Sequence, residues 1–302
     1  MPIFRITHGL LRGFLIALGA VAVTLATTAG AEAQDDSAFH EIETKYIFGD
    51  ITVGSSTGIE GEKAFEPETG ADFGKRGGNY AASLTELEYE YTPNQFVQLE
   101  FGPTVSYYDI HGVGGLNDLN LGTFNGFAGT FRSLLVDRGP SPLAVTLSLE
   151  PEFHSRDETS GTRIVNYELE AKLESDYELI NNRLFLGSNI LYEPETTRGD
   201  LGAWFNESTF GISSALAYQI VPKVVVGADL WYLRHNEGVG FNTFTGDAYY
   251  LGPTFYWQVS SKVLVSAAWE TQIAGHEVGV SPALDLTDFS HYRAKLLLEF
   301  EF

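Results

Sequence analysis

The sequence predicts an all-β fold, an antiparallel up-and-down transmembrane β-barrel of about twelve strands. Three observations support this prediction: apolar and polar residues alternate over long stretches, short turns join these stretches in pairs, and aromatic residues recur near both ends of the apolar faces. The alternative is a soluble β-sandwich, whose strands have about five or six residues. Because most stretches here exceed ten residues, tilted strands that cross a bilayer fit better.

The N-terminal segment predicts export from the cytoplasm. Arg5 and Arg12 supply basic charge before an apolar run from Gly13 to Ala29, and the small-x-small sequence Ala-Glu-Ala follows at 31–33. We therefore expect residues 1–33 to be a signal peptide and residues 34–302 to form the barrel.

The composition excludes several classes of protein. The chain has 40 acidic and 18 basic residues and a net charge of −22, so we expect no nucleic-acid partner. It has no cysteine, which excludes disulfides, thiolate metal sites and cysteine nucleophiles. Beyond the N-terminus, no apolar stretch approaches the roughly 18 residues of a membrane-spanning helix. We expect neither a metal nor another cofactor.

The clearest hairpin begins at Ser83. Up to Tyr91, leucine and tyrosine alternate with glutamate, and a turn over 92–95 leads into a second alternating stretch. Similar hairpins recur along the chain, although their residues are not copied. The strands are expected near residues 40–55, 80–92, 95–108, 124–137, 143–154, 163–179, 183–193, 203–220, 223–234, 247–259, 262–274 and 290–302.

Two of these expected strands, the first and the fourth, do not keep one alternating phase, which a β-bulge would explain. Longer polar connections, the first over residues 56–79, alternate with the short turns. This order places both termini on the side of the short turns, which we expect to face the periplasm.

The polar faces of the strands predict an acidic lumen. The expected lumen-lining acids are Glu86, Glu88, Glu90, Glu100, Glu150, Glu152, Glu168, Glu170, Glu174, Glu178, Asp229 and Glu270. The expected lumen-lining bases are Lys172, Arg293 and Lys295. Uncompensated carboxylates favour positive solutes. The alternative is that these charges solvate the wall or pair across strands, and Arg293 and Lys295 lie near the level of Glu270 for such pairing.

The last strand resembles a known assembly signal. Residues 291–302 have apolar side chains at every second position, and the segment ends in phenylalanine. It is similar to the C-terminal signal of Gram-negative outer-membrane β-barrels, which implies a place in the outer membrane and insertion by the barrel assembly machinery. The signal residues are Tyr292, Leu296, Leu298, Phe300 and Phe302. The hairpins are also similar, more loosely, to transporter-like barrels of the phenol-degradation-pathway type.

The expected function is a passive channel or transporter-like protein for small solutes, preferring cations and surrounded by outer-membrane lipid and lipopolysaccharide. One alternative is a plugged structural or surface-interaction barrel. Another is a lipid-modifying hydrolase, which needs a nucleophile such as Ser208 beside a loop histidine on the lipid-facing surface. Because Ser208 does not lie in a Gly-x-Ser-x-Gly motif, we do not expect an enzyme.

The predicted first loop is rich in acidic side chains, namely Glu60, Glu62, Glu66, Glu68 and Asp72. Their spacing lacks the ligand order of a calcium-binding loop. We expect a solvated loop that shares divalent ions with lipopolysaccharide only weakly.

Overall fold

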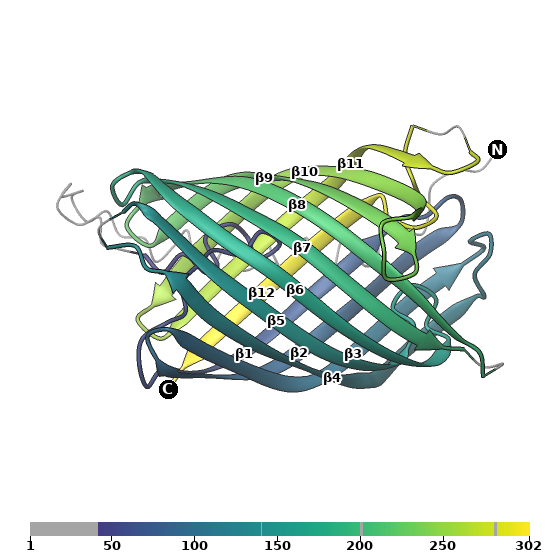
Figure 1. Ribbon diagram of the computed structural model, residues 1–302, viewed down its shortest axis with the longest axis horizontal. Coiled ribbons are helices and arrows are strands. Elements are labelled where there is room, and N and C mark those ends of the chain that lie inside the picture. Colours follow the sequence, from purple (N-terminus) through teal and green to yellow (C-terminus); the bar gives the residue numbers. More distant parts are fainter. Residues whose placement is uncertain (1–41, 140, 200–201, 281–282) are drawn as a thin grey trace, which may run out of the picture. The chain divides into compact units, whose positions relative to one another are not determined.

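Twelve antiparallel strands close into a barrel (Figure 1). The computed structural model describes residues 42–139, 141–199, 202–280 and 283–302, so the predicted signal peptide lies outside the described residues. The strands are β1 (Lys63–Phe73), β2 (Asn79–Asn94), β3 (Val97–His111), β4 (Leu119–Val136), β5 (Leu143–Arg156), β6 (Arg163–Ile180), β7 (Leu184–Arg198), β8 (Trp204–Val221), β9 (Val224–Glu237), β10 (Thr243–Ser260), β11 (Val263–Glu277) and β12 (Tyr292–Glu301).

The barrel closes where β1 pairs with β12. Phe65 lies opposite Phe300, and Phe73 lies opposite Tyr292. Each of the remaining strand pairs joins two strands that follow each other in the chain. The sheet therefore has no free edge, which a β-structure in a bilayer requires because lipid offers no hydrogen bonds to the backbone.

The two ends of the barrel differ in their connections. At the turn end, short turns such as 95–96, 222–223 and 261–262 join the strands, and β12 finishes there. At the loop end, the connections include 112–118 and the longest one, 278–291. Figure 1 shows the C-terminus at the turn end, on the left.

The outer surface is apolar between two groups of aromatic side chains. Phe101, for example, is 61% exposed although it lies within a strand. Such exposure is expected when lipid is the solvent for the outer face. Tyr89, Tyr91, Tyr177 and Tyr218 are exposed towards the turn end, and Tyr107, Trp204 and Tyr249 towards the loop end.

The prediction of the first strand was wrong. Residues 42–55 form no strand, and β1 lies within the stretch that was predicted to be the loop 56–79. Pro67 and Gly70 break the alternating pattern of β1. The apolar residues before Val53 face the interior of the barrel and not lipid. They resemble a strand in sequence because burial in the lumen also requires apolar side chains.

The fourth predicted strand loses its phase because it contains a bulge. Gly126 lies opposite Thr104 and Phe124 lies opposite Val105, so Asn125 is the extra residue. Its side chain is fully buried and its amide nitrogen donates to Ser106 Oγ at 3.0 Å. The bulge thus turns a polar side chain into the lumen.

Candidate functional site in the barrel lumen

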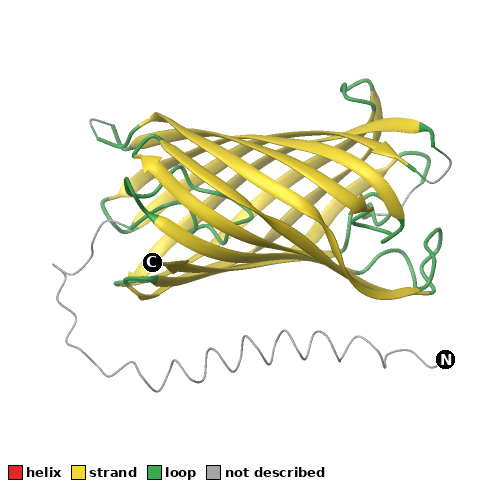
Figure 2. Ribbon diagram, turned by 90° about the horizontal axis from the view of Figure 1, so that it is seen from below, coloured by secondary structure: helices red, strands yellow, loops and turns green. Residues whose placement is uncertain are grey.

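The lumen contains a segment of the chain itself. Residues 42–58, here called the plug, precede β1 and fold inside the turn-end half of the barrel; Figure 2 shows loops within the ring of strands near the C-terminus. Tyr46, Ile47 and Phe48 are at most 2% exposed. At the tip of the plug, Ile51 packs near the middle of the barrel. At its end, Thr57 Oγ1 donates to Gln95 O in the β2–β3 turn.

One attachment of the plug is apolar. Tyr46, Ile47 and Phe48 pack in a buried cluster with side chains from the wall that include Phe185 and Leu297. Gly187 makes room for Phe48, because a Cβ at this position would lie 2.9 Å from the phenylalanine ring. The sequence thus places the smallest residue of β7 where the ring of Phe48 meets the wall.

A second attachment is a buried ion-pair cluster. Lys45 Nζ lies 2.7 Å from Glu90 and 2.5 Å from Glu100, with Glu66 at 3.6 Å. The Tyr46 hydroxyl donates to the Glu66 carboxylate at 2.6 Å. Lys45 is 3% exposed, so these carboxylates replace the water that would otherwise solvate its charge.

The returning arm of the plug is held by further wall side chains. Arg132 donates to the carbonyl oxygens of Gly54 and Ser56 at 2.9 and 3.1 Å, and it pairs with Glu174. Asp176 accepts hydrogen bonds from the Ser55 backbone and hydroxyl. These contacts use side chains, whereas β1 to β12 are joined by backbone ladders. The plug is therefore attached to the barrel without being part of its sheet.

On the loop side of the plug lies a chamber of about 390 Å³. Its apolar lining includes Tyr80, Trp231 and Tyr250, and its floor includes Ile51 of the plug. Five acidic and four basic side chains also line it, so the chamber itself is nearly balanced in charge. The loop 278–291 forms part of its roof through Phe289 and Ser290.

The roof is docked by hydrogen bonds to its backbone. Gln272 donates to Asp285 O at 2.8 Å, and Lys75 Nζ donates to Thr287 O and Asp288 O at 3.0 and 3.2 Å. Asp285 is fully buried. Burial and the nearby Asp288 carboxylate raise the pKa of Asp285 from 3.8 to about 6.

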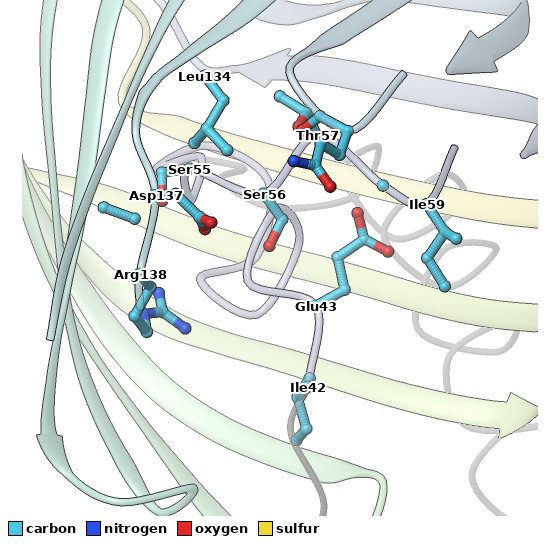
Figure 3. Close-up of a pocket in the computed structure, with 12 residues that line it drawn as sticks. Ile42, Glu43, Ser55, Ser56, Thr57, Ile59, Leu134, Asp137 and Arg138 are labelled. Atoms are coloured by element: carbon cyan, nitrogen blue, oxygen red, sulfur yellow. The ribbon is translucent and has the colours of Figure 1, made fainter. Parts of the chain in front are cut away.

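On the turn side of the plug lies a second cavity, an open cleft of about 430 Å³. Figure 3 shows Glu43, Asp137 and Arg138 around it. The lining also includes Ser56 and Thr57 of the plug. The plug thus separates a cleft at the turn end from a chamber towards the loop end.

The predicted lumen acids alternate with the exposed apolar residues of their strands and therefore lie on the inner face of the wall. Glu90 and Glu100 contact the plug through Lys45, and Glu174 does so through Arg132. The predicted cross-strand pair forms between Arg293 and Glu270, whose atoms Nε and Oε2 are 2.8 Å apart.

Other predicted lumen residues have partners elsewhere. Lys295 does not pair with Glu270, because it contacts Glu68 of β1 and Asp50 of the plug. Lys172 pairs with Glu170 at 2.5 Å on its own strand.

Sequence reasoning missed the plug residues and the acids of β1. Glu66, Glu68 and Asp72 are inner-wall residues and not members of a solvated loop, so the predicted ion-sharing loop was wrong. The available signal was Lys45 and Asp50, two charges inside an apolar stretch that keeps no alternating phase. Charges within such a stretch need partners, and here these come from distant strands.

The residues of the hydrolase alternative are not brought together. The Ser208 hydroxyl is buried and donates to Gly238 O at 2.8 Å. His235 Nδ1 lies 2.9 Å from the hydroxyl of Thr245. The pairing of β8 with β9 places Ser208 opposite Asn236, so His235 points to the other face of the sheet.

The fold and the lumen define a class: the protein is a closed, twelve-stranded antiparallel β-barrel, with the fold of a Gram-negative outer-membrane channel. The chain belongs to a family of unknown function, DUF6662, whose model matches residues 40–302. No curated protein matches the chain.

Several solved structures are similar to the chain. The COG4313 outer membrane channel from Pseudomonas putida F1 is similar over 82% of this chain and 98% of its own, with a TM-score of 0.57 and 9% sequence identity. The NanC porin is 9% identical with a TM-score of 0.47, covering 79% of this chain and 100% of its own. LpxR from Salmonella typhimurium is 11% identical with a TM-score of 0.42, and the match covers 79% of this chain and 100% of its own.

Proposed function

We propose that the protein is a narrow outer-membrane channel for small solutes that is closed by its own plug. The observation that carries this proposal is the arrangement of the lumen, in which residues 42–58 separate two cavities of about 430 and 390 Å³. Movement of the plug would join them into one path. Short turns in such barrels face the periplasm, so the plug would enter the barrel from that side.

The form of the plug supports movement. Its contacts with the wall are side-chain contacts, such as those of Lys45 and Ser55, and water or wall residues can replace them one at a time. Closure of the sheet depends on β1 and β12 and not on the plug. The barrel can therefore remain intact while its lumen opens.

We further propose that the open channel prefers cations. The support comes from a small cavity between the chamber and the plug, which is lined by eight acidic and four basic side chains. Uncompensated carboxylates in a low-dielectric passage lower the barrier for positive solutes. The reversal potential in a salt gradient measures this preference, and an anion-selective potential would contradict it.

A truncated chain tests the channel proposal. The predicted signal peptide is joined directly to Ile59, which removes the plug and keeps β1 to β12. In planar bilayers we expect the truncated barrel to show larger and steadier conductance steps than the full mature chain. Heat-modifiable migration in gels shows that the variant is folded.

The second candidate is a plugged structural barrel, and the buried pairs of Lys45 with Glu90 and Glu100 favour it because they hold the plug in place. Conductance in planar bilayers distinguishes the channel from the plugged structural barrel. A folded full-length barrel that never conducts, together with a conducting truncated barrel, would contradict the channel and support this candidate.

A further inference from the structure

We propose that Glu86, Glu88 and Glu150 form a binding site for a divalent cation, with Ca²⁺ as the best match. One carboxylate oxygen from each of the three side chains lies within 4.8 Å of the other two. Glu86 and Glu88 come from the same face of β2, and Glu150 comes from β5. The proposal concerns binding and does not depend on whether the lumen conducts.

The wall between these strands is shaped for the approach of the three side chains. β3 and β4 lie between β2 and β5. Level with Glu88 they present Gly102 and Ala128, which lie opposite each other, and this row reaches β5 at Glu152, two residues from Glu150. A Cβ on Gly102 would come within 2.8 Å of Glu88 Cα, so a larger residue would not fit there. Small residues on the two intervening strands thus let long glutamates meet above them.

The strongest sign of a missing partner is Glu88. It is 3% exposed, and its Oε1 atom is buried without a hydrogen-bond partner in the described part of the chain. A buried carboxylate oxygen without a donor or a cation is unfavourable. This oxygen therefore indicates a ligand that the side chains of the wall do not supply.

The basic side chains of this region are engaged with other acids. Lys45 contacts Glu90 and Glu100, and Lys295 contacts Glu68. The third base, Lys172, pairs with Glu170.

Arg132, the fourth base, pairs with Glu174. Because the surrounding cavity has eight carboxylates and only these four bases, positive charge is needed beside the three glutamates.

The size and chemistry of the cavity favour Ca²⁺. It measures about 40 Å³, which suits one ion with one or two water molecules. Carboxylate oxygens are hard ligands, and Ca²⁺ binds them at about 2.3–2.6 Å. Because the three carboxylate oxygens lie within 4.8 Å of one another, all three can reach a single Ca²⁺ at such distances.

The site also touches the plug. Lys45, Tyr46 and Asp50 line the same small cavity as the three glutamates. A bound cation would therefore sit where the plug meets the wall. Loss of the cation would leave the negative charges of the three glutamates facing Asp50 without compensation.

Calorimetry on the folded, full mature chain in detergent tests the proposal. The protein is washed with a chelator and titrated with CaCl₂ alone at constant ionic strength. We expect one calcium per chain with a dissociation constant of about 10⁻⁴–10⁻³ M, the range of extracellular calcium sites. A Glu86→Gln/Glu150→Gln variant should bind at least tenfold more weakly.

The matched control is Glu168→Gln/Glu193→Gln, which removes two lumen acids of β6 and β7 outside the small cavity. It should bind calcium like the unchanged protein. Heat-modifiable migration confirms that each variant is folded. Absence of stoichiometric binding to the unchanged protein would overturn the proposal and indicate that protons neutralise the cluster. Equal loss in both variants would overturn it too, since calcium would then bind the acidic lumen without preference for the three glutamates.

Discussion

Lys45 is the residue on which the polar attachment of the plug depends. Its ammonium group is shared among Glu66, Glu90 and Glu100 and is almost fully buried. Removing one partner of a buried ion pair costs about 3–5 kcal/mol because the remaining charges stay uncompensated. We expect Lys45→Met to loosen the plug and leave the strands in place.

Hydrogen exchange checks this prediction residue by residue. Amides in 44–57 should exchange at least about 100-fold faster in Lys45→Met, while amides in β2 and β3 keep their protection. Lys63→Met is the control, since Lys63 is an exposed base at the start of β1. Unchanged exchange in the plug would show that the apolar cluster around Phe48 holds it without the lysine.

At the scale of elements, β12 carries a prediction about assembly. Phe302 follows the last strand, and its backbone nitrogen donates at 3.1 Å to the carbonyl oxygen of Lys63, the first residue of β1. Its ring lies 6.1 Å from that of Tyr89. Deletion of Phe302 should slow closure of the barrel and increase the amount of unassembled protein in the periplasm.

The amount of heat-modifiable barrel in the outer membrane measures the effect of this deletion. Phe302→Tyr, which keeps the ring and the backbone contact, should assemble normally. Equal amounts of barrel for the deletion and the unchanged chain would contradict a role of the last residue in assembly.

A second element, the roof loop 278–291, should respond to pH. Its Asp285 has a pKa raised to about 6 when docked, against 3.8 in the unfolded chain. The docked loop therefore binds the proton more tightly than the free loop, so docking is strongest below about pH 4 and weakens as the pH rises through 6. Asp288, Glu277 and Lys75 are the charged groups around it.

Hydrogen exchange of the roof loop between pH 4 and pH 8, corrected for intrinsic rates, measures this effect. Protection should fall with rising pH in the unchanged protein and stay constant in Asp285→Asn. Protection that increases with pH would contradict the shifted pKa.

At the scale of the whole molecule, the sequence predicts most of the wall. Lipid requires an apolar outer face on every strand, so alternation marks hairpins such as β2–β3 directly in the chain. Alternation does not reveal β1, because Pro67 and Gly70 interrupt the pattern and the outer face of this strand is short. Residues 42–55 imitate a strand because burial in the lumen also selects apolar residues.

The interior was less predictable than the wall. Alternation shows that Glu90 and Glu100 face inward, but not that they meet Lys45, which lies 45 and 55 residues earlier. Contacts across a lumen depend on how the barrel closes, and local patterns contain no information about this. The pair of Arg293 with Glu270 was predictable because these residues lie on adjacent strands.

The central claim, that the lumen opens only when the plug moves, is tested most directly by tethering the plug to the wall. The hydroxyl oxygens of Thr52 and Ser213 are 2.8 Å apart, so Thr52→Cys/Ser213→Cys can form a disulfide between plug and wall. The chain has no other cysteine. Thr44→Cys/Ser56→Cys is the matched control, because it joins two arms of the plug whose hydroxyls are 3.1 Å apart.

Single-channel conductance is measured for both variants before and after addition of a reductant. We predict that the oxidised Thr52→Cys/Ser213→Cys barrel does not conduct and that reduction restores its conductance, while the control conducts in both states. Equal conductance of the oxidised and reduced Thr52→Cys/Ser213→Cys barrel would contradict the account, since solutes would then pass a plug that cannot leave.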